Sequence, residues 1–291
     1  MNHIFTRKKF YMMIIPAFLL FSLYQIFPVI IAFYYSLTNF QGLGEFKFFG
    51  FKNYILLMHN KLFWLSFKNT IIITISALII SVPFSYILAL IVNKKTKGIA
   101  FLKATFFAPY TIALIIVGQI WVFILDPSIG LINSVLKAIG LEFLTQQWIG
   151  GLTLTPYSAA VVQAWIYSGF MMVILLTGIK MIPEDVFESS TIDGATRLQQ
   201  IFYITTPMLK ESFKIIVVFM LTGCLRVFET VYILTNGGPN HYSETIVSFM
   251  YNTTFISHKY GYGMAIAVVE FILAAAVSII FLTATRREID Y

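Results

Sequence analysis

The sequence predicts an all-α membrane protein with six transmembrane helices, and three observations lead to this prediction. Hydrophobic residues make up 58% of the 291 residues and charged residues only 11%, whereas a soluble domain of this size needs far more charge to cover its surface. Mean hydropathy is +0.82. Six separate stretches each hold about 20 mainly apolar residues, the length that crosses a bilayer. The composition excludes a soluble enzyme, a disordered chain and a DNA-binding module.

The six apolar stretches are predicted to be helices. Within the hydrocarbon core every backbone polar group must be satisfied inside its own segment, so an open chain crosses the bilayer as helices. Three basic residues precede the first stretch, as in a signal peptide, but its apolar core is too long for one and no small-residue cleavage site follows. We therefore interpret it as a retained span. The predicted spans cover about residues 11–37, 70–92, 104–125, 158–182, 215–234 and 262–285.

The connections between the spans are too short for separate globular domains, so we expect one membrane domain over residues 1–291. The first connection is rich in aromatic residues, which favour the headgroup region of a membrane, and this predicts an interfacial helix over about residues 52–67. The last connection carries NGGP at residues 236–239, which is either a plain turn or a flexible stretch that helps the loop reach a protein partner outside the membrane or the outer gate.

The distribution of Lys and Arg predicts that both termini face the cytoplasm, because basic residues are enriched in cytoplasmic loops. The opposite side holds six basic residues, of which the four in the first connection oppose this rule. Topology thus accounts for the net charge of +7, and we expect no nucleic-acid partner. The 13 basic residues assigned to the cytoplasmic side, out of 20, are Arg7, Lys8, Lys9, Lys94, Lys95, Lys97, Lys103, Lys180, Arg197, Lys210, Lys214, Arg286 and Arg287.

The sequence contains no recognisable catalytic or metal-binding motif. A GxxxxGK[ST] phosphate loop, an HExxH zinc motif and a GxSxG nucleophile motif are all absent. The four histidines are scattered, and Cys224 is the single cysteine. We therefore expect no catalytic residue, metal or cofactor in this chain. The alternative interpretation is a six-span carrier or channel that works alone, although neither a selectivity filter nor a set of ion-coupling acids is visible.

The connection over residues 183–210 is predicted to form two short helices with a corner between them. The proline that opens it suits the first turn of a helix, and Gly194 allows a sharp turn that a side chain would hinder. Asp193 or Thr196 is placed to cap the second helix, which Pro207 is expected to end. Both helices carry more apolar residues than a linker needs, which predicts docking against another protein.

The order of residues in this connection resembles the EAA loop of the permease subunits of binding-protein-dependent ABC importers. In that family the signature begins Glu-Ala-Ala and continues with Asp-Gly-Ala. Here Ser189 and Ser190 stand in place of the two alanines, and both are small enough for close packing. The residues that match the signature positions are Glu188, Ser189, Ser190, Asp193, Gly194, Ala195, Phe202 and Pro207.

The resemblance covers nearly the whole chain and is strongest to the sugar-importing branch, of the maltose, lactose and glycerol-phosphate permease kind. It includes FFGFKNY in the first connection, GLIN at residues 130–133, and LRVFETVYILTNGGP and YGYGMAIAVV in the C-terminal third. It implies the type I permease fold of ABC importers and no enzymatic activity of the chain itself.

The resemblance also implies the partners. They are a homologous second permease, two ABC subunits that bind ATP and Mg, and an extracytoplasmic solute-binding protein. The chain is then expected among the lipids of a bacterial cytoplasmic membrane. Its EAA loop docks on the ATPase, where Glu188 makes the charge contact while Gly194 and Ala195 permit the corner and the close approach.

Aromatic and polar residues within the spans are candidates for the solute path, because sugars are held by aromatic stacking and by hydrogen bonds. Arg226 and Glu229 lie three residues apart on one helix face, and they either neutralise each other or contact the solute. Glu270 stands where the resemblance predicts an apolar residue, and we expect it to face the cavity or a basic partner and to tune specificity. The full set of candidates is Gln119, Gln163, Tyr167, Arg226, Glu229 and Glu270.

Overall fold

The computed structural model describes residues 2–94 and 96–285, and it describes side chains from residue 12 onwards. Three of the basic residues behind the predicted orientation, Lys95, Arg286 and Arg287, lie outside the described residues. The side chains of Arg7, Lys8 and Lys9 lie outside them as well. The orientation of the termini therefore stays a prediction.

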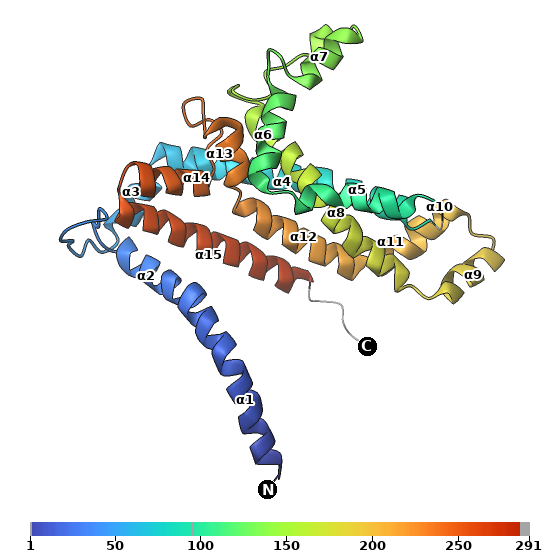
Figure 1. Ribbon diagram of the computed structural model, residues 1–291, viewed down its shortest axis with the longest axis horizontal. Helices are drawn as coiled ribbons and strands as arrows, with labels where there is room; N and C mark the ends of the chain where they lie inside the picture. The colour runs from blue at the N-terminus through green and yellow to red at the C-terminus, as the bar shows by residue number, and fades with distance from the viewer. Residues whose placement is uncertain (1, 95, 286–291) are drawn as a thin grey trace. The chain divides into compact units, whose positions relative to one another are not determined.

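The chain divides into two compact units, and each is described by itself. Unit 1 comprises Met1–Phe63 with Phe249–Leu273, and unit 2 comprises Trp64–Ser248 with Ala274–Tyr291. The described residues form helices throughout, apart from turns, loops and one isolated β-bridge between Thr38 and Phe48. Figure 1 shows the helices in chain order. The single domain predicted over residues 1–291 stays a prediction.

The prediction of six spans is confirmed when two bent helix pairs are each counted as one span. In the described part of the chain, four helices are long and apolar enough to cross a membrane without a break: Met12–Ser36, α4 (Lys61–Val92), α8 (Thr155–Lys180) and α15 (Tyr260–Thr285). The bent pairs are α5 (Ile99–Thr111) with α6 (Leu114–Leu125), at 100°, and α12 (Lys210–Leu225) with α13 (Glu229–Thr235), at 48°.

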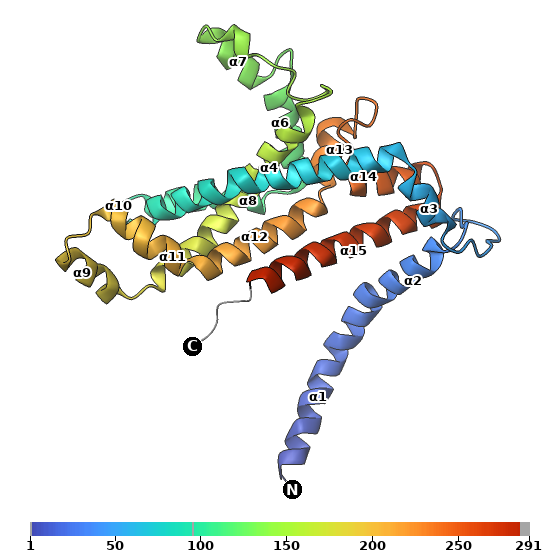
Figure 2. The same cartoon turned by 180° about the vertical axis from the view of Figure 1, so that it is seen from behind.

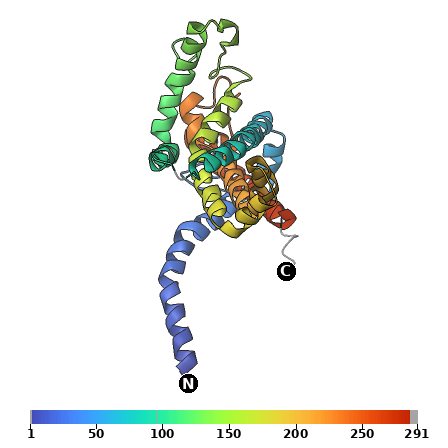
Figure 3. The ribbon, with the colours of Figure 1, turned by 90° about the vertical axis from the view of Figure 1, so that its right-hand side faces the viewer.

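The break between α5 and α6 has a local cause. Ile112 and Ala113 both leave helical geometry, with φ −80° and ψ 142° at Ile112 and φ −57° and ψ 130° at Ala113. Pro109, in the last turn of α5, lacks the N–H that a continuous helix would use. Figure 3 shows α6 turning away from α5. The apolar pattern of the third predicted span contained no sign of this break beyond the proline.

Unit 1 begins with one long helical run. It consists of α1 (Asn2–Phe21), the π turn η1 (Ser22–Ile26) and α2 (Phe27–Ser36). Two short segments, α14 (Ile246–Tyr251) and the π turn η4 (Asn252–Ile256), precede α15.

The single interfacial helix predicted over residues 52–67 is wrong. Instead, α3 (Lys52–Met58) ends before Asn60, and α4 begins at Lys61. The side-chain oxygen of Asn60 accepts a hydrogen bond from the backbone N–H of Leu62 at 2.9 Å. An asparagine that accepts from the second helical residue is a capping residue, so it starts a new helix instead of continuing α3.

Unit 2 is built around α8, which packs against α5, α12 and α13. Most residues of α8 are buried, among them Met171, Met172 and Leu175. Small residues set the closest approaches, as expected between membrane helices. A Cβ atom at Gly169 would lie 1.9 Å from the carbonyl oxygen of Phe106 in α5. The apolar helices of this unit are therefore held at backbone contact.

The two ends of unit 2 carry different connections. At one end, α7 (Leu131–Ala138) and the short 3-10 turn η2 (Glu142–Leu144) follow α6. Asn133 holds this connection together: its amide donates to the carbonyls of Pro127 at 3.0 Å and Gln146 at 2.9 Å, and its oxygen accepts from the indole N–H of Trp148 at 2.8 Å. Figure 2 shows α9 (Glu184–Ile192) at the opposite end of this unit.

Candidate functional site

The connection over residues 183–210 forms the predicted corner. α9 follows Pro183 and carries two acidic residues in its first turn, where the positive end of the helix dipole favours them. Gly194 then adopts φ +83°, a conformation that residues with a Cβ rarely adopt. The chain continues into α10 (Arg197–Gln199), the π turn η3 (Gln200–Thr205) and α11 (Thr206–Met208).

Thr196 caps the second half of the loop. Its hydroxyl accepts from the backbone N–H of Gln199 at 3.4 Å, and the Gln199 side chain accepts from the backbone N–H of Thr196 at 2.7 Å. This reciprocal pair is a capping box. Of the two residues that the sequence offered as caps, Asp193 and Thr196, the structure therefore uses Thr196.

Gln200 connects the two halves of the loop, and the sequence analysis missed it. Its amide donates to the hydroxyl of Ser190 at 2.9 Å and to that of Thr191 at 3.0 Å, both on α9. Ser190 in turn donates to the carbonyl of Phe187 at 2.8 Å. An alanine in place of Ser190 would offer no acceptor, so the serine adds an attachment point at this corner.

The prediction that Pro207 ends the second helix is wrong. The helical run continues past Pro207 to Met208, and α12 begins at Lys210. Proline lacks an N–H and crowds the turn before it, and here the preceding turn is the widened π turn η3. The hydroxyl of Thr206 donates to the carbonyl of Ile201 at 2.7 Å, which satisfies an acceptor within this irregular turn.

The loop exposes a run of large apolar side chains. Ile192 is 86% exposed, Phe202 64% and Tyr203 78%. Glu188 and Asp193 are also exposed, beside these residues in the chain. A hollow of about 270 Å³ lies at the corner, lined by Asp193, Gly194, Ala195, Gln199, Tyr203 and Ile204. Exposed apolar side chains with charges among them are typical of a surface that a protein partner covers.

A second feature of unit 2 is a cavity of about 440 Å³ where the two broken spans meet. Aromatic rings form one wall: Tyr110 stacks on Phe170 at 4.6 Å between ring centroids, and Tyr167 meets Phe219 edge to face at 5.7 Å. The lining comes from the α5–α6 break, from α8 and from the C-terminal half of α12, and consists of Tyr110, Ile112, Leu114, Ile166, Tyr167, Phe219, Thr222, Gly223 and Arg226.

The structure brings two of the six candidate path residues, Tyr167 and Arg226, into this cavity. Gln163 is buried and donates to the hydroxyl of Thr230 at 2.9 Å, so it ties α8 to α13. Gln119 and Glu229 are exposed and do not line the cavity. Glu270 is half-buried on α15 in unit 1.

The sequence analysis missed the other wall residues of the cavity. Tyr110 precedes the α5–α6 break, and Phe219 lies two helical turns before Arg226. Both occur in continuous apolar stretches, where nothing in the pattern separates a cavity residue from a core residue. The only local signal is the proline before the break.

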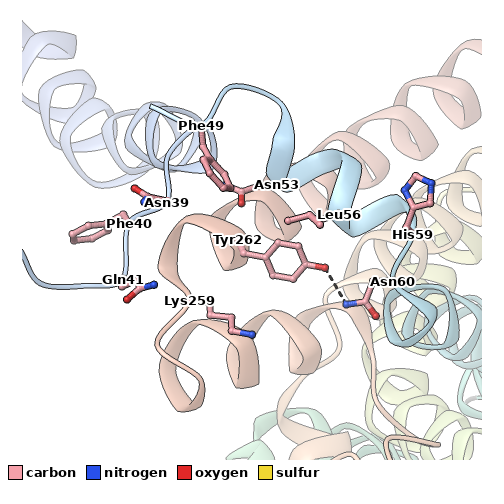
Figure 4. Close-up of a pocket in the computed structure, with 10 residues that line it drawn as sticks. All are labelled: Asn39, Phe40, Gln41, Phe49, Asn53, Leu56, His59, Asn60, Lys259 and Tyr262. Carbon is pink, nitrogen blue, oxygen red and sulfur yellow. Dashed lines mark hydrogen bonds between the residues drawn. The ribbon is translucent and has the colours of Figure 1, made fainter. Parts of the chain in front are cut away.

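Unit 1 holds a larger cavity, of about 710 Å³, between the first connection and the start of α15 (Figure 4). Two side-chain amides in its wall form hydrogen bonds within the protein. Asn60 donates to the hydroxyl of Tyr262 at 3.0 Å, and Asn53 donates to the carbonyls of Ser36 and Thr38, both at 2.8 Å. These amides fasten the first connection, so the cavity at the broken spans is the stronger candidate for a solute site.

Comparisons with a family model and with individual relatives all indicate transport permeases. Residues 70–290 match the family described as "Binding-protein-dependent transport system inner membrane component". The chain is 34% identical to the probable ABC transporter permease protein YurN of Bacillus subtilis, over 92% of this chain and 93% of that protein. It is 30% identical to the trehalose/maltose transport system permease protein MalF of Thermococcus litoralis, over 97% of this chain and 95% of that protein.

Solved structures share the fold. A chain from the crystal structure of a bacterial alginate ABC transporter, in complex with an alginate pentasaccharide-bound periplasmic protein, superposes with a TM-score of 0.85. The sequence identity is 24%, and the match covers 98% of this chain and 96% of that one. This likeness confirms the predicted type I permease fold.

Proposed function

Because the chain belongs to the family of binding-protein-dependent transport system inner membrane components, we propose that it forms one half of the solute path of an ATP-driven importer for a sugar or sugar-like solute. A homologous permease supplies the other half, two ABC subunits bind ATP and Mg, and an extracytoplasmic binding protein delivers the solute. Relatives named for sugar transport and a fold neighbour titled as an alginate transporter with its periplasmic protein support this assignment. The location is the bacterial cytoplasmic membrane.

The observation that carries the proposal is the cavity at the two broken spans. Discontinuous helices near the middle of a membrane are a recurrent way to place polar groups at a solute site. Here the breaks at Ile112–Ala113 and at Arg226–Phe228 bring helix ends to the same cavity, which also has an aromatic wall. Aromatic faces with a few polar groups suit a sugar ring.

The EAA loop is the proposed connection to the ATPase. Glu188, Asp193 and Phe202 are exposed on this loop, which supports a contact with a partner. Closure of the ATPase dimer would move α9, and the bond from Gln200 to Ser190 would pass that movement to the helical run that leads into α12. α12 contributes Phe219, Thr222 and Gly223 to the cavity lining, and Arg226 directly follows it, so movement of the loop would reach the proposed solute site.

Glu270 has a separate role in this proposal. Its side chain is half-buried on the last span, where an acidic group is rare and is tolerated when it is paired or faces a water-filled path. We expect Glu270→Gln to change the range of solutes without changing membrane insertion. An unchanged range and rate of uptake would remove Glu270 from the path.

The experiment that tests the proposed function is reconstitution of the chain with its sister permease, ABC subunits and binding protein in liposomes. We expect sugar uptake that requires ATP and the binding protein. Phe202→Glu should abolish uptake while the chain stays inserted, because a charge would enter the apolar docking face. Leu131→Glu, on an exposed face of α7, is the matched control and should transport normally.

Uptake that proceeds without ATP and without the ABC subunits would contradict the proposal. It would instead support the alternative, a carrier or channel that works alone. Co-purification of an ABC subunit that is lost in Phe202→Glu and kept in Leu131→Glu would locate the contact independently of transport.

A further inference from the structure

Arg226 is the residue of the cavity whose charge no described residue balances in an ion pair. It lies at the end of α12, directly after Leu225, and its side chain is exposed where it lines the cavity with Thr222 and Gly223. Every other lining residue of this cavity is uncharged. Within the residues that the structure describes, no carboxylate lies at ion-pair distance from the Arg226 guanidinium.

Glu229 makes no ion pair with Arg226 in the described structure. The two residues are separated by one turn in sequence, but the chain leaves helical geometry at Arg226 and at Phe228, where φ is −131°. The helical spacing that would place the two side chains together is therefore lost at the break between α12 and α13. No ion pair joins them in the described structure, and Glu229 is outside the cavity lining.

The chemistry of the cavity is that of a cation beside an aromatic wall. A guanidinium offers a planar fork of N–H donors that matches carboxylate, sulfonate and phosphate groups, and these charge-assisted bonds are stronger than bonds to neutral hydroxyls. The rings of Tyr110, Tyr167 and Phe219 supply a face for the carbon skeleton of a sugar. A volume of about 440 Å³ falls within the usual range for small-ligand sites.

We propose that the transported solute is an anionic sugar, with Arg226 binding its carboxylate, sulfonate or phosphate group while the aromatic wall holds the ring. This inference rests on the proposed function, since it names the substrate class of the same cavity. Arg226 is thereby a specificity-determining residue, and a neutral sugar lacks the group that it recognises.

A purely structural role for Arg226 predicts something different. A cation at a helix C-terminus is favoured by the helix dipole, and Arg226 occupies that position on α12. Loss of that interaction would lower stability equally with or without solute. It would not change the ratio between the affinities for anionic and neutral sugars, which is the quantity to measure.

The test uses the assembled transporter without its binding protein, so that selectivity of the permease is measured alone. Thr222→Cys places a thiol in the cavity wall, and the native Cys224 is buried. Protection of the new thiol from a maleimide is measured with galacturonate against galactose, and with glucose 6-phosphate against glucose. The Thr222→Cys chain is compared with chains that also carry Arg226→Gln or Arg226→Lys. The control carries Lys137→Gln, which removes one positive charge from α7.

We expect the anionic member of each pair to protect at a concentration about tenfold or more below that of its neutral partner, the factor that corresponds to one charge-assisted hydrogen bond. Arg226→Gln should remove the preference, Arg226→Lys should keep part of it, and Lys137→Gln should keep all of it. Added salt should weaken protection by the anionic sugars selectively.

Equal protection by both members of a pair, or a preference that survives Arg226→Gln, would overturn the inference. If neutral sugars protect equally and are imported by liposomes that also contain the binding protein, the proposed function stands and only the anionic class is wrong. If no sugar of either kind protects, and none is imported by those liposomes, the proposed function and this inference both fail. Should Arg226→Gln not assemble, Arg226→Lys and the salt dependence give the same decision.

Discussion

The side-chain amide of Gln200 donates a hydrogen bond of 2.9 Å to the hydroxyl of Ser190, and this bond joins the two halves of the EAA loop. Ser190 lies on α9, whereas Gln200 begins the π turn that leads toward α12. A force applied to α9 is therefore passed to the fifth span through side chains as well as through the backbone corner. Ser190 stands where the family signature has alanine, so this chain has an attachment that the usual residue would not provide.

Removing this attachment should reduce coupling. In Gln200→Ala and in Ser190→Ala we expect ATP hydrolysis to continue while the amount of solute imported per ATP falls, because each variant loses bonds worth about 1 kcal/mol apiece. The double variant should lose less than the sum of the two single variants, because both single variants remove the same bond between Gln200 and Ser190. Ser189→Ala is the matched control, since the Ser189 hydroxyl bonds only within its own helix, to the carbonyl of Val186 at 3.2 Å. Additive losses in the double variant would argue against a shared bond.

The corner at Gly194 should tolerate a side chain in the isolated subunit but not in the transporter. An added Cβ would meet no atom within 4 Å, and only the positive φ of +83° opposes it. Asparagine accepts this conformation better than other side chains. We therefore expect Gly194→Asn to insert normally and to lose coupling, because its side chain would occupy the space proposed for the ATPase. Measurements of membrane insertion and ATP-dependent uptake check this, and normal uptake would contradict it.

Close backbone contact at Gly169 should control stability. Its added Cβ would lie 1.9 Å from the carbonyl oxygen of Phe106, so α5 and α8 would have to separate. We expect Gly169→Ala to lower the free energy of unfolding by about 1–3 kcal/mol, visible as a lower melting temperature in detergent. The control is Gly223→Ala, whose Cβ would stay 3.7 Å from the Tyr167 hydroxyl. That variant should melt normally and bind solute more weakly, because it narrows the cavity.

Asn69 should order the loop that contains NGGP. Its amide donates to the carbonyls of Tyr242 at 2.8 Å and Glu244 at 3.0 Å. Asn69→Leu removes the donor from the buried carbonyl of Glu244 and from the part-buried carbonyl of Tyr242, which costs about 1–3 kcal/mol for the buried group. We expect faster hydrogen exchange over residues 236–245 and little change elsewhere. Asn93→Leu, an exposed amide just beyond the other end of α4, should exchange like the parent chain.

The turn after α6 should respond to acid. The Asp126 carboxylate accepts from the backbone N–H groups of Ile129 at 2.9 Å and Ser128 at 2.8 Å, and these bonds lower its pKa below the usual 3.8. Because the pKa of Asp126 is lower in the folded chain than in the unfolded chain, its carboxylate stabilises the turn at pH values above the unfolded pKa. This stabilisation is lost as the pH falls through the folded pKa. A titration of the Asp126 carboxyl by NMR should give a midpoint below 3.8. In Ser128→Pro one of the two donors is gone, and the midpoint should move up toward the usual value.

Some of these features were predictable because they depend on neighbours in the sequence. The corner at Gly194 and the cap at Thr196 follow from residue types whose conformational preferences act over three or four positions. The prediction that Pro207 ends the second helix was wrong because it used only such local preferences. A proline favours a helix end because it lacks an N–H. Here the preceding π turn accommodates the proline, and the Thr206 hydroxyl bonds the carbonyl of Ile201. No preference of neighbouring residues predicts this irregular turn.

The sequence alone determined the membrane class, the six spans and the family, because apolar length, charge distribution and motif order are properties of the chain read in one dimension. Only the tertiary structure decided which residues share the cavity at the two broken spans. Tyr110 and Arg226 are far apart in sequence and meet because both spans break at the same cavity, and the break at Arg226 also separates it from Glu229. Periodicity assumes an unbroken helix, so it paired Arg226 with Glu229, whereas the packed structure breaks the helix between them and places Arg226 at the cavity.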